Sequence, residues 1–336
     1  MSIKHLLSLL IIYSISLPLH AQIFRQPEQD GFRVFKIVFN NDTANVLVKS
    51  KKGEETEQKP IFFFCQGSLP IPLILGDDQG TFGTFPFTAD SVMEKYHLVI
   101  VGKTGVPVAV NIKQLDKDYT FYKDKPGVYP EAYLQKNYAE YYIKRNEEII
   151  RVLLKQQWVD KNKLIVAGHS EGSYIAASMA SETKAITHLI YSGGNPLGRM
   201  MTIITRNRKD EKDTIQLAEQ DFSDWKNIVD HPDDTKSDNG DPSKTTYSFS
   251  KPLLEDFTQL KIPAFVSYGT NDYGSAPFND YLRFEMIRLK KKNIFFKAYI
   301  GKEHNYFSLH KDGSINYDDY NWDKVMQDWL LWLDKN

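Results

Sequence analysis

The sequence predicts an α/β protein with a mostly parallel central sheet, helices on both faces and an antiparallel N-terminal edge. Two observations lead to this fold class. Near-continuous apolar runs of strand length recur along the chain, as is typical of parallel strands covered on both faces. Segments with helical periodicity lie between these runs. The apolar runs span residues 59–67, 96–105, 162–170, 186–194, 262–272 and 293–301.

The N-terminal edge is predicted from residues 31–53, which read as two strands joined by a turn. β-branched and aromatic residues stand on both sides of Asn40-Asn41-Asp42. Asparagine and aspartate are typical of tight turns between antiparallel strands. This hairpin precedes the first buried run, so it is expected at the edge of the sheet.

Three segments are predicted to be helices. Residues 146–160 place Ile150, Leu154 and Trp158 four residues apart, with Asn146 as the helix start. Residues 277–292 begin with Pro277, which a first helical turn accepts. Residues 322–335 form an amphipathic helix at the end of the chain.

Residues 197–259 interrupt the alternation of strands and helices. They are polar, and residues 231–246 are rich in turn-forming side chains. We interpret 197–259 as a cap-like insertion over one end of the sheet, with one or two helices within 210–230. The sequence therefore predicts a single domain over residues 22–336.

Residues 1–21 have the pattern of a signal peptide. Lys4 gives a positive start, residues 6–19 are mainly apolar, and Ala21 places a small residue before a cut at Gln22. The alternative is a membrane anchor, but the apolar run is shorter than the about 20 residues of a spanning helix. We expect a periplasmic or secreted protein without stable membrane insertion once this segment is removed.

Composition excludes several function classes. The chain has 336 residues and a net charge of −1, which does not suit a general nucleic-acid binder. The one cysteine, Cys65, lies in an apolar run and is predicted to be a buried thiol. Residues 233–241 resemble a calcium loop in part but lack its closing glutamate. No nucleotide-binding motif is present, and the scattered histidines lack the spacing of metal ligands, so we predict neither a cofactor nor a metal.

A serine stands between two glycines where a buried strand gives way to a helix. The sequence there is Gly168-His169-Ser170-Glu171-Gly172. A turn this sharp lifts the central side chain clear of the sheet, and side chains at the flanking glycines would meet neighbouring backbone. We predict that Ser170 is a catalytic nucleophile.

A serine nucleophile needs a base and an acid that orients the base. Asp272 follows a buried strand and is the predicted acid; Asp280 and Asp256 fall on helical or inserted segments. His304 follows the last strand and is the predicted base, with His310 as the reserve. The order Ser170, Asp272, His304 suits this architecture.

An oxyanion hole requires two donors of the N–H type. The first is predicted to be the N–H of Glu171, directly after the nucleophile. The second is expected from the loop after the strand at 59–67, where either Gly67 or Ser68 could donate. His169 is expected to point away from the reacting groups as a structural neighbour of Ser170.

These motifs resemble those of the α/β-hydrolase superfamily, particularly its esterases and the catalytic domain of prolyl-oligopeptidase-like enzymes. The resemblance covers about residues 55–335 apart from the insertion. It rests on "CQGS", "GHSEGS", "YGTNDYGSAP" and "GKEHNYF", which occur in that order. The resemblance implies a triad of Ser170, Asp272 and His304 without metal or cofactor. Gln66-Gly67 replaces the His-Gly that many relatives carry after the oxyanion strand.

Three functions are compatible with these residues. The first is an exported serine hydrolase that cleaves a small carboxylic ester through an acyl-enzyme. The second is a peptidase or amidase of the prolyl-oligopeptidase-like type, although the sequence has no room for the large propeller domain of those enzymes. The third is a non-catalytic binding protein on the same fold. The loop at 68–90 is rich in Pro, Leu and Phe and forms either an apolar pocket wall or packing beneath the insertion.

Overall fold

A computed structural model describes residues 25–336, except residues 117, 213 and 238–239. The predicted signal peptide, residues 1–21, lies outside the described residues. Within the described part of the chain, no helix is both long enough and apolar enough to cross a membrane.

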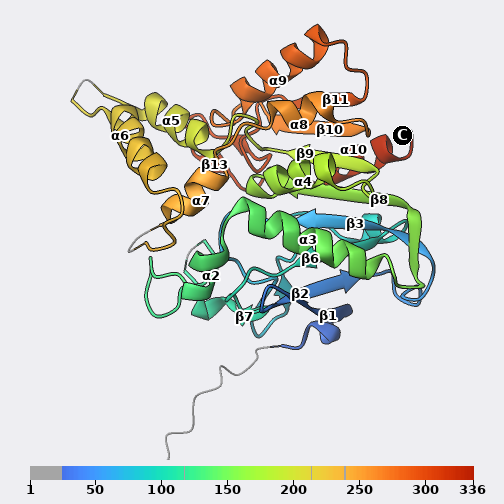
Figure 1. Ribbon diagram of the computed structural model, residues 1–336. Coiled ribbons are helices and arrows are strands. Elements are labelled where there is room, and N and C mark those ends of the chain that lie inside the picture. Colours follow the sequence, from blue (N-terminus) through green and yellow to red (C-terminus); the bar gives the residue numbers. More distant parts are fainter. Residues whose placement is uncertain (1–24, 117, 213, 238–239) are drawn as a thin grey trace, which may run out of the picture.

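An eight-stranded sheet runs through the molecule in the order β1-β2-β6-β3-β8-β9-β10-β11 (Figure 1). β1 pairs with β2 and β2 pairs with β6 antiparallel, whereas the pairs from β6 to β11 are parallel. The predicted mostly parallel sheet with an antiparallel N-terminal edge is therefore confirmed. The strands are β1 (Phe32–Phe39), β2 (Asp42–Lys49), β3 (Lys59–Cys65), β6 (His97–Val101), β8 (Val159–His169), β9 (His188–Ser192), β10 (Ala264–Gly269) and β11 (Ile294–Tyr299).

The predicted turn between β1 and β2 is also confirmed. Asn40 and Asn41 connect the strands and both have positive φ, 46° and 59°. Two consecutive residues of positive φ match the twist of an antiparallel hairpin, and asparagine tolerates this conformation.

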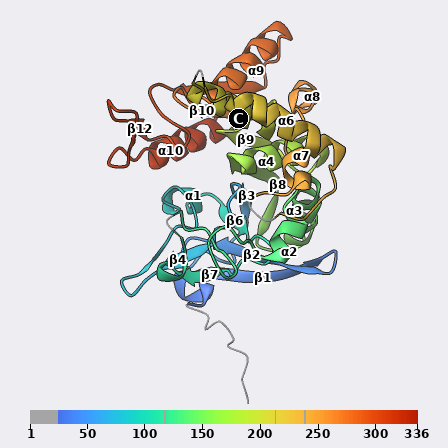
Figure 2. The same cartoon turned by 90° about the vertical axis from the view of Figure 1, so that its left-hand side faces the viewer.

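Helices cover both faces of the sheet (Figure 2). Successive side chains of a strand point to opposite faces, and in the central strands the side chains on both faces are buried. In β3, Ile61 and Phe63 pack on the side of α3, α4, α8 and α9, while Phe62 and Phe64 pack on the side of α1 and α10. This double burial explains the unbroken apolar runs of the sequence. The helices are α1 (Asp90–Met93), α3 (Ala139–Leu153), α4 (Glu171–Glu182), α8 (Leu254–Gln259), α9 (Ala276–Arg288) and α10 (Trp322–Leu333).

The helix predicted at residues 146–160 is misplaced. α3 ends at Leu153, and Trp158 lies in the turn before β8. Asn146, the predicted start, is buried inside the helix. The first half of α3 buries tyrosines and Arg145, whose guanidinium donates to Gly102 O at 2.9 Å. Polar atoms on these side chains interrupt the apolar pattern, so the periodicity of apolar residues does not reveal this face of the helix.

The segment 197–259 is more helical than expected. It contains α5 (Arg199–Asp210), α6 (Leu217–Asp230), α7 (Ser243–Ser248) and α8. α5, α6 and α7 project beyond the end of the sheet toward which the β3 arrow points (Figure 1). Several smaller elements were not predicted. A short helix α2 (Glu131–Lys136) precedes α3, and a three-stranded sheet joins β5 (Thr81–Phe82), β4 (Ile74–Gly76) and β7 (Ala109–Asn111).

Candidate active site

Ser170 occupies the sharp turn that the sequence predicts between β8 and α4. Its backbone has φ 57° and ψ −128°, a conformation that side chains rarely adopt. A Cβ added at Gly168 would lie 2.0 Å from Gly172 O, and one at Gly172 would lie 2.1 Å from Cys65 O. The flanking positions therefore have no room for a side chain, while position 170 carries a hydroxyl despite the strain.

Asp272 and His304 meet at the carboxyl ends of β10 and β11. His304 Nδ1 lies 2.6 Å from Asp272 Oδ2, and Ser275 Oγ donates to the same oxygen at 2.6 Å. Gly269 allows the two loops to approach, because a Cβ there would lie 2.5 Å from Glu303 O. The aspartate side chain is buried, whereas the histidine ring is about a quarter exposed.

The environment of Asp272 favours its carboxylate form. Burial alone would raise its pKa, but the hydrogen bonds from His304 and Ser275 and the charge of Arg206 outweigh burial. The pKa of Asp272 is therefore held well below its ordinary value. An ionised carboxylate at this position fixes the orientation of the His304 ring through Nδ1. This bond does not engage the other ring nitrogen, Nε2.

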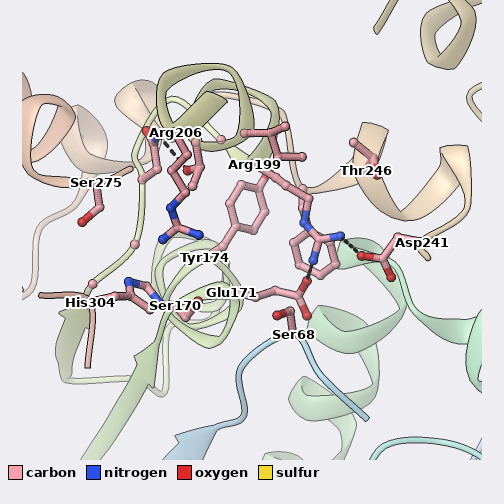
Figure 3. Close-up of a pocket in the computed structure, with 17 residues that line it drawn as sticks. Ser68, Ser170, Glu171, Tyr174, Arg199, Arg206, Asp241, Thr246, Ser275 and His304 are labelled. Atoms are coloured by element: carbon pink, nitrogen blue, oxygen red, sulfur yellow. Dashed lines mark hydrogen bonds and ion pairs between the residues drawn. The ribbon is translucent and has the colours of Figure 1, made fainter. Parts of the chain in front are cut away.

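Ser170 and His304 line the same cavity, where Figure 3 places their side chains next to each other. The structure thus brings the three residues predicted from the sequence to one place. His169, predicted to point away, instead packs against His304, with ring centroids 4.8 Å apart. It also accepts or donates a hydrogen bond with Ser192 Oγ at 3.0 Å and meets Trp322 edge-on. It therefore supports one side of the His304 ring.

The loop after β3 passes beside the serine, as predicted for an oxyanion loop. A Cβ at Gly67 would lie 3.9 Å from Ser170 Cβ. Two buried side chains donate to the carbonyl oxygen of the next residue, Ser68. Lys103 Nζ donates to Ser68 O at 2.7 Å, and Tyr133 Oη donates to the same oxygen at 2.8 Å. The choice between Gly67 and Ser68 as the second donor stays a prediction.

The same lysine also contacts Glu171, the residue after Ser170. Lys103 Nζ lies 3.4 Å from Glu171 Oε1, and both side chains are buried. Arg199 of α5 bonds the other oxygen of Glu171 and also pairs with Asp241. Burial lowers the pKa of Lys103, and the neighbouring carboxylates of Glu171 and Asp241 oppose this effect. This network joins the two predicted oxyanion segments to the insertion.

Two cavities meet at the serine. One, of about 390 Å³, has a mixed lining and is called the polar cavity because it contains the charged side chains of Arg199, Arg206 and Glu171. The other, of about 450 Å³, is mainly apolar and is formed largely by residues 64–86. Ser68, Ser170 and His304 line both cavities. The apolar loop at 68–90 therefore forms a pocket wall, and none of the described residues of 197–259 lines that pocket.

The alternatives that the sequence left open lie elsewhere. Asp280 accepts a hydrogen bond from Tyr268, and Asp256 accepts one from Ser181. His310 is exposed in the loop beyond β11. Cys65 is buried, as predicted, and burial raises the pKa of its thiol to about 12.

Lys103 and Arg206 were not identified from the sequence. Each stands outside the recognisable motifs, and no spacing rule links them to Ser170. Among the described residues, no group of three or more histidine, cysteine or carboxylate side chains is arranged to hold a metal ion.

No protein-family model matches this sequence, and no curated protein matches it either. Solved structures resemble it at low identity. Est1E from Butyrivibrio proteoclasticus aligns with 11% identity and a TM-score of 0.53 over 90% of this chain and 99% of its own. A membrane phospholipase A, described as a bacterial virulence factor, aligns with 14% identity and a TM-score of 0.51 over 91% of this chain and 86% of its own.

A peptidase shares the same core. Pyrococcus horikoshii acylaminoacyl peptidase aligns with 12% identity and a TM-score of 0.51 over 81% of this chain. This chain spans only 37% of the peptidase's length. The three likenesses concern the fold, and they confirm the architecture implied by the sequence motifs.

Proposed function

We propose that this chain, which has the fold of the α/β-hydrolase superfamily, is a serine hydrolase that cleaves carboxylic esters. Ser170 Oγ attacks the acyl carbon while His304 accepts its proton. The C–O bond to the alcohol breaks, and His304 returns the proton to the leaving oxygen. A water molecule, deprotonated by His304, then attacks the acyl-enzyme and releases the acid.

One observation carries this proposal. His304, which bonds Asp272 at 2.6 Å, lines the same cavity as Ser170, whose backbone is strained. Strain of this kind costs about 1–3 kcal/mol and persists where function requires it. A buried carboxylate that orients a partly exposed histidine stabilises the imidazolium formed during attack.

Oxyanion stabilisation is the second requirement. In the proposal, the N–H of Glu171 at the start of α4 and an N–H of Gly67 or Ser68 bind the developing charge. Removing one such donor typically costs about 3–4 kcal/mol of transition-state stabilisation. The bonds from Lys103 and Tyr133 to Ser68 O support this role, since they hold the loop in place before substrate arrives.

Esters are favoured over peptides by the pattern of likeness. The chain matches 86% of a phospholipase and 37% of a peptidase, so the part of the peptidase outside the shared core has no counterpart in the match. A peptidase or amidase remains the second candidate because the proposed machinery can serve either leaving group. A non-catalytic binding role is disfavoured, because Ser170, Asp272 and His304 are all present.

We also propose that the protein is exported, on the pattern of residues 1–21. N-terminal sequencing of protein from the periplasm or medium should begin near Gln22. Retention of Met1 in a membrane fraction would contradict export.

The proposed activity is tested with a panel of acyl esters and aminoacyl amides of matched acyl group. Wild type should hydrolyse esters faster than amides, and His304→Ala should lose nearly all turnover while remaining folded. His310→Ala is the matched control and should retain activity, because His310 is exposed. Preferred cleavage of amides would favour the peptidase reading, and absence of turnover on every substrate would favour the binding protein.

A further inference from the structure

We infer that the substrate is a two-sided ester, with an apolar group on one side of the scissile bond and an anionic group on the other. This inference rests on the proposed function and specifies its substrate class. It comes from the two cavities that meet at Ser170 and His304. An ester bound at Ser170 has two substituents, and each cavity can receive one of them.

The apolar cavity suits an alkyl or aromatic group. Its wall includes the apolar side chains of Leu69, Ile71, Leu75, Phe85 and Trp322. At about 450 Å³ it lies within the range of small-ligand sites. Burial of apolar area is favourable and grows with each methylene group, so a chain of several carbons would gain affinity there.

The polar cavity holds an arginine that points into it. Figure 3 shows the guanidinium of Arg206, from α5, directed toward the space beside His304 and Ser170. Gly274 makes room for this placement, since a Cβ there would lie 2.6 Å from Arg206 Nε and 2.8 Å from Thr202 Cγ2. The arginine side chain is about half exposed, so a ligand can reach it.

Arg206 has fewer ion-pair partners than Arg199, the other arginine of this cavity. Arg199, in the same cavity, pairs with both Glu171 and Asp241. Arg206 has one ion-pair partner among the described residues, Asp272 at 3.4 Å. That carboxylate already accepts shorter bonds from His304 and Ser275. Arg206 is therefore the cation of this cavity that is available to a ligand.

The chemistry of the guanidinium defines the anionic group. Its planar donors match the oxygens of a carboxylate or a phosphate, which it binds in a bidentate way. Hydrogen bonds to charged groups are stronger than neutral ones, and 1.4 kcal/mol corresponds to a tenfold change in affinity. We therefore expect Arg206 to favour an anionic ester over its neutral parent by about tenfold or more.

The test compares esters that differ in one charged group. Titration measures the rate at which each ester releases acid. Ethyl hexanoate is the neutral parent of the hexanoate esters of glycolate and of glycol phosphate, which carry the anion on the alcohol side. Hexyl butanoate is the neutral parent of monohexyl succinate, which carries it on the acyl side. The readout is the ratio of kcat/KM for each anionic ester to that of its parent.

In wild type, kcat/KM for at least one anionic ester should exceed that of its neutral parent by about tenfold. The preferred ester identifies carboxylate or phosphate and its side of the bond. Arg206→Gln should bring this ratio close to one, and the ratio cancels any general loss caused through Asp272. Arg208→Gln is the matched control, since Arg208 lies on the same helix and pairs with Glu211 and Glu219 instead.

The apolar half of the inference has its own comparison. Shortening the six-carbon chain of the preferred ester to two carbons, acetate for hexanoate or ethyl for hexyl, should lower kcat/KM, because the shorter group leaves the apolar cavity unfilled. Equal kcat/KM for the two-carbon and six-carbon esters would overturn this half.

Failure of the inference is distinguishable from failure of the proposed function. If wild type hydrolyses neutral esters but prefers no anionic one, or if the preference survives Arg206→Gln, the inference alone is wrong. If wild type hydrolyses none of the esters, the proposed function fails and the inference fails with it.

Discussion

At the scale of single residues, the turn at Ser170 combines a steric need for glycine with a chemical need for a hydroxyl. Gly168 and Gly172 satisfy the steric need, because a Cβ at either would meet backbone atoms. Position 170 has φ 57° and would also suit glycine, yet it carries serine. The strain is therefore best explained by the use of the hydroxyl.

This strain predicts a difference between two variants that both remove the hydroxyl. Ser170→Gly should be more stable toward denaturant than Ser170→Ala by about 1 kcal/mol, because glycine adopts the conformation without a Cβ penalty. Urea unfolding of both variants measures the difference. A Ser170→Ala protein as stable as Ser170→Gly would show that the turn stores no strain.

At the scale of elements, Lys103 links the segments that the proposal assigns to the oxyanion hole. It follows β6 and contacts the loop after β3 through Ser68 O and the start of α4 through Glu171. Its ammonium also lies over the rings of Tyr133 and Tyr142, 5.5 and 5.4 Å from their centroids. We predict that a buried cation held in this way acts as a positioning residue, because it bonds the backbone of the loop and lines neither cavity at Ser170.

Replacing this lysine tests that role. Lys103→Met keeps much of the stem but removes the ammonium, so Ser68 O loses one of its two donors. We expect kcat for ester hydrolysis to fall about ten- to a hundredfold with a smaller change in KM, since the loss concerns the transition state.

Lys113→Met provides the control, because Lys113 is exposed and pairs with Asp78. An unchanged kcat in a folded Lys103→Met protein, or a change confined to KM, would show that Lys103 does not position the loop.

The elements also show what the sequence reveals and what it conceals. The central strands could be predicted because both faces are covered, which gives unbroken apolar runs. The start of α3 could not, because its buried face includes Arg145 and Asn146 among tyrosines and apolar residues, so polar side chains interrupt the apolar pattern. The strands β4, β5 and β7 are two or three residues long, too short for a pattern.

The same distinction applies to the candidate site. Ser170 could be proposed from the glycines around it, and Asp272 and His304 from their positions after buried strands. Arg206 could not, since it reaches the cavity from a helix of the 197–259 segment. Lys103 could not either, since it contacts Ser68 and Glu171 from a loop that is distant from both in the sequence.

At the scale of the whole molecule, buried histidines couple stability to pH. His97, His169 and His188 are buried, and burial lowers the pKa of each below its ordinary value. As the pH falls below about 6.5, these histidines become protonated in the unfolded chain but stay neutral in the folded protein. The free energy of unfolding should therefore fall as the solution becomes more acidic.

We predict a loss of up to about 1.4 kcal/mol per pH unit for each histidine that stays neutral in the folded state. Urea unfolding at pH values between about 7.5 and 5.5 measures this slope, in a window above the ordinary carboxylate range. His188→Asn should reduce the slope, whereas replacement of the exposed His310 should not. Stability that is constant or rises toward acidic pH would contradict the prediction.

The central claim, that Ser170 is an activated nucleophile, is tested most directly by covalent labelling with a fluorophosphonate followed by intact-mass spectrometry. Wild type should gain one phosphonyl group, and peptide mapping should place it on Ser170. Ser170→Ala should gain none. Ser181→Ala is the matched control, because Ser181 lies on the same helix and bonds Asp256 away from the cavity, and it should label like wild type. Normal labelling of Ser170→Ala, or a folded wild type that never labels, would contradict the account.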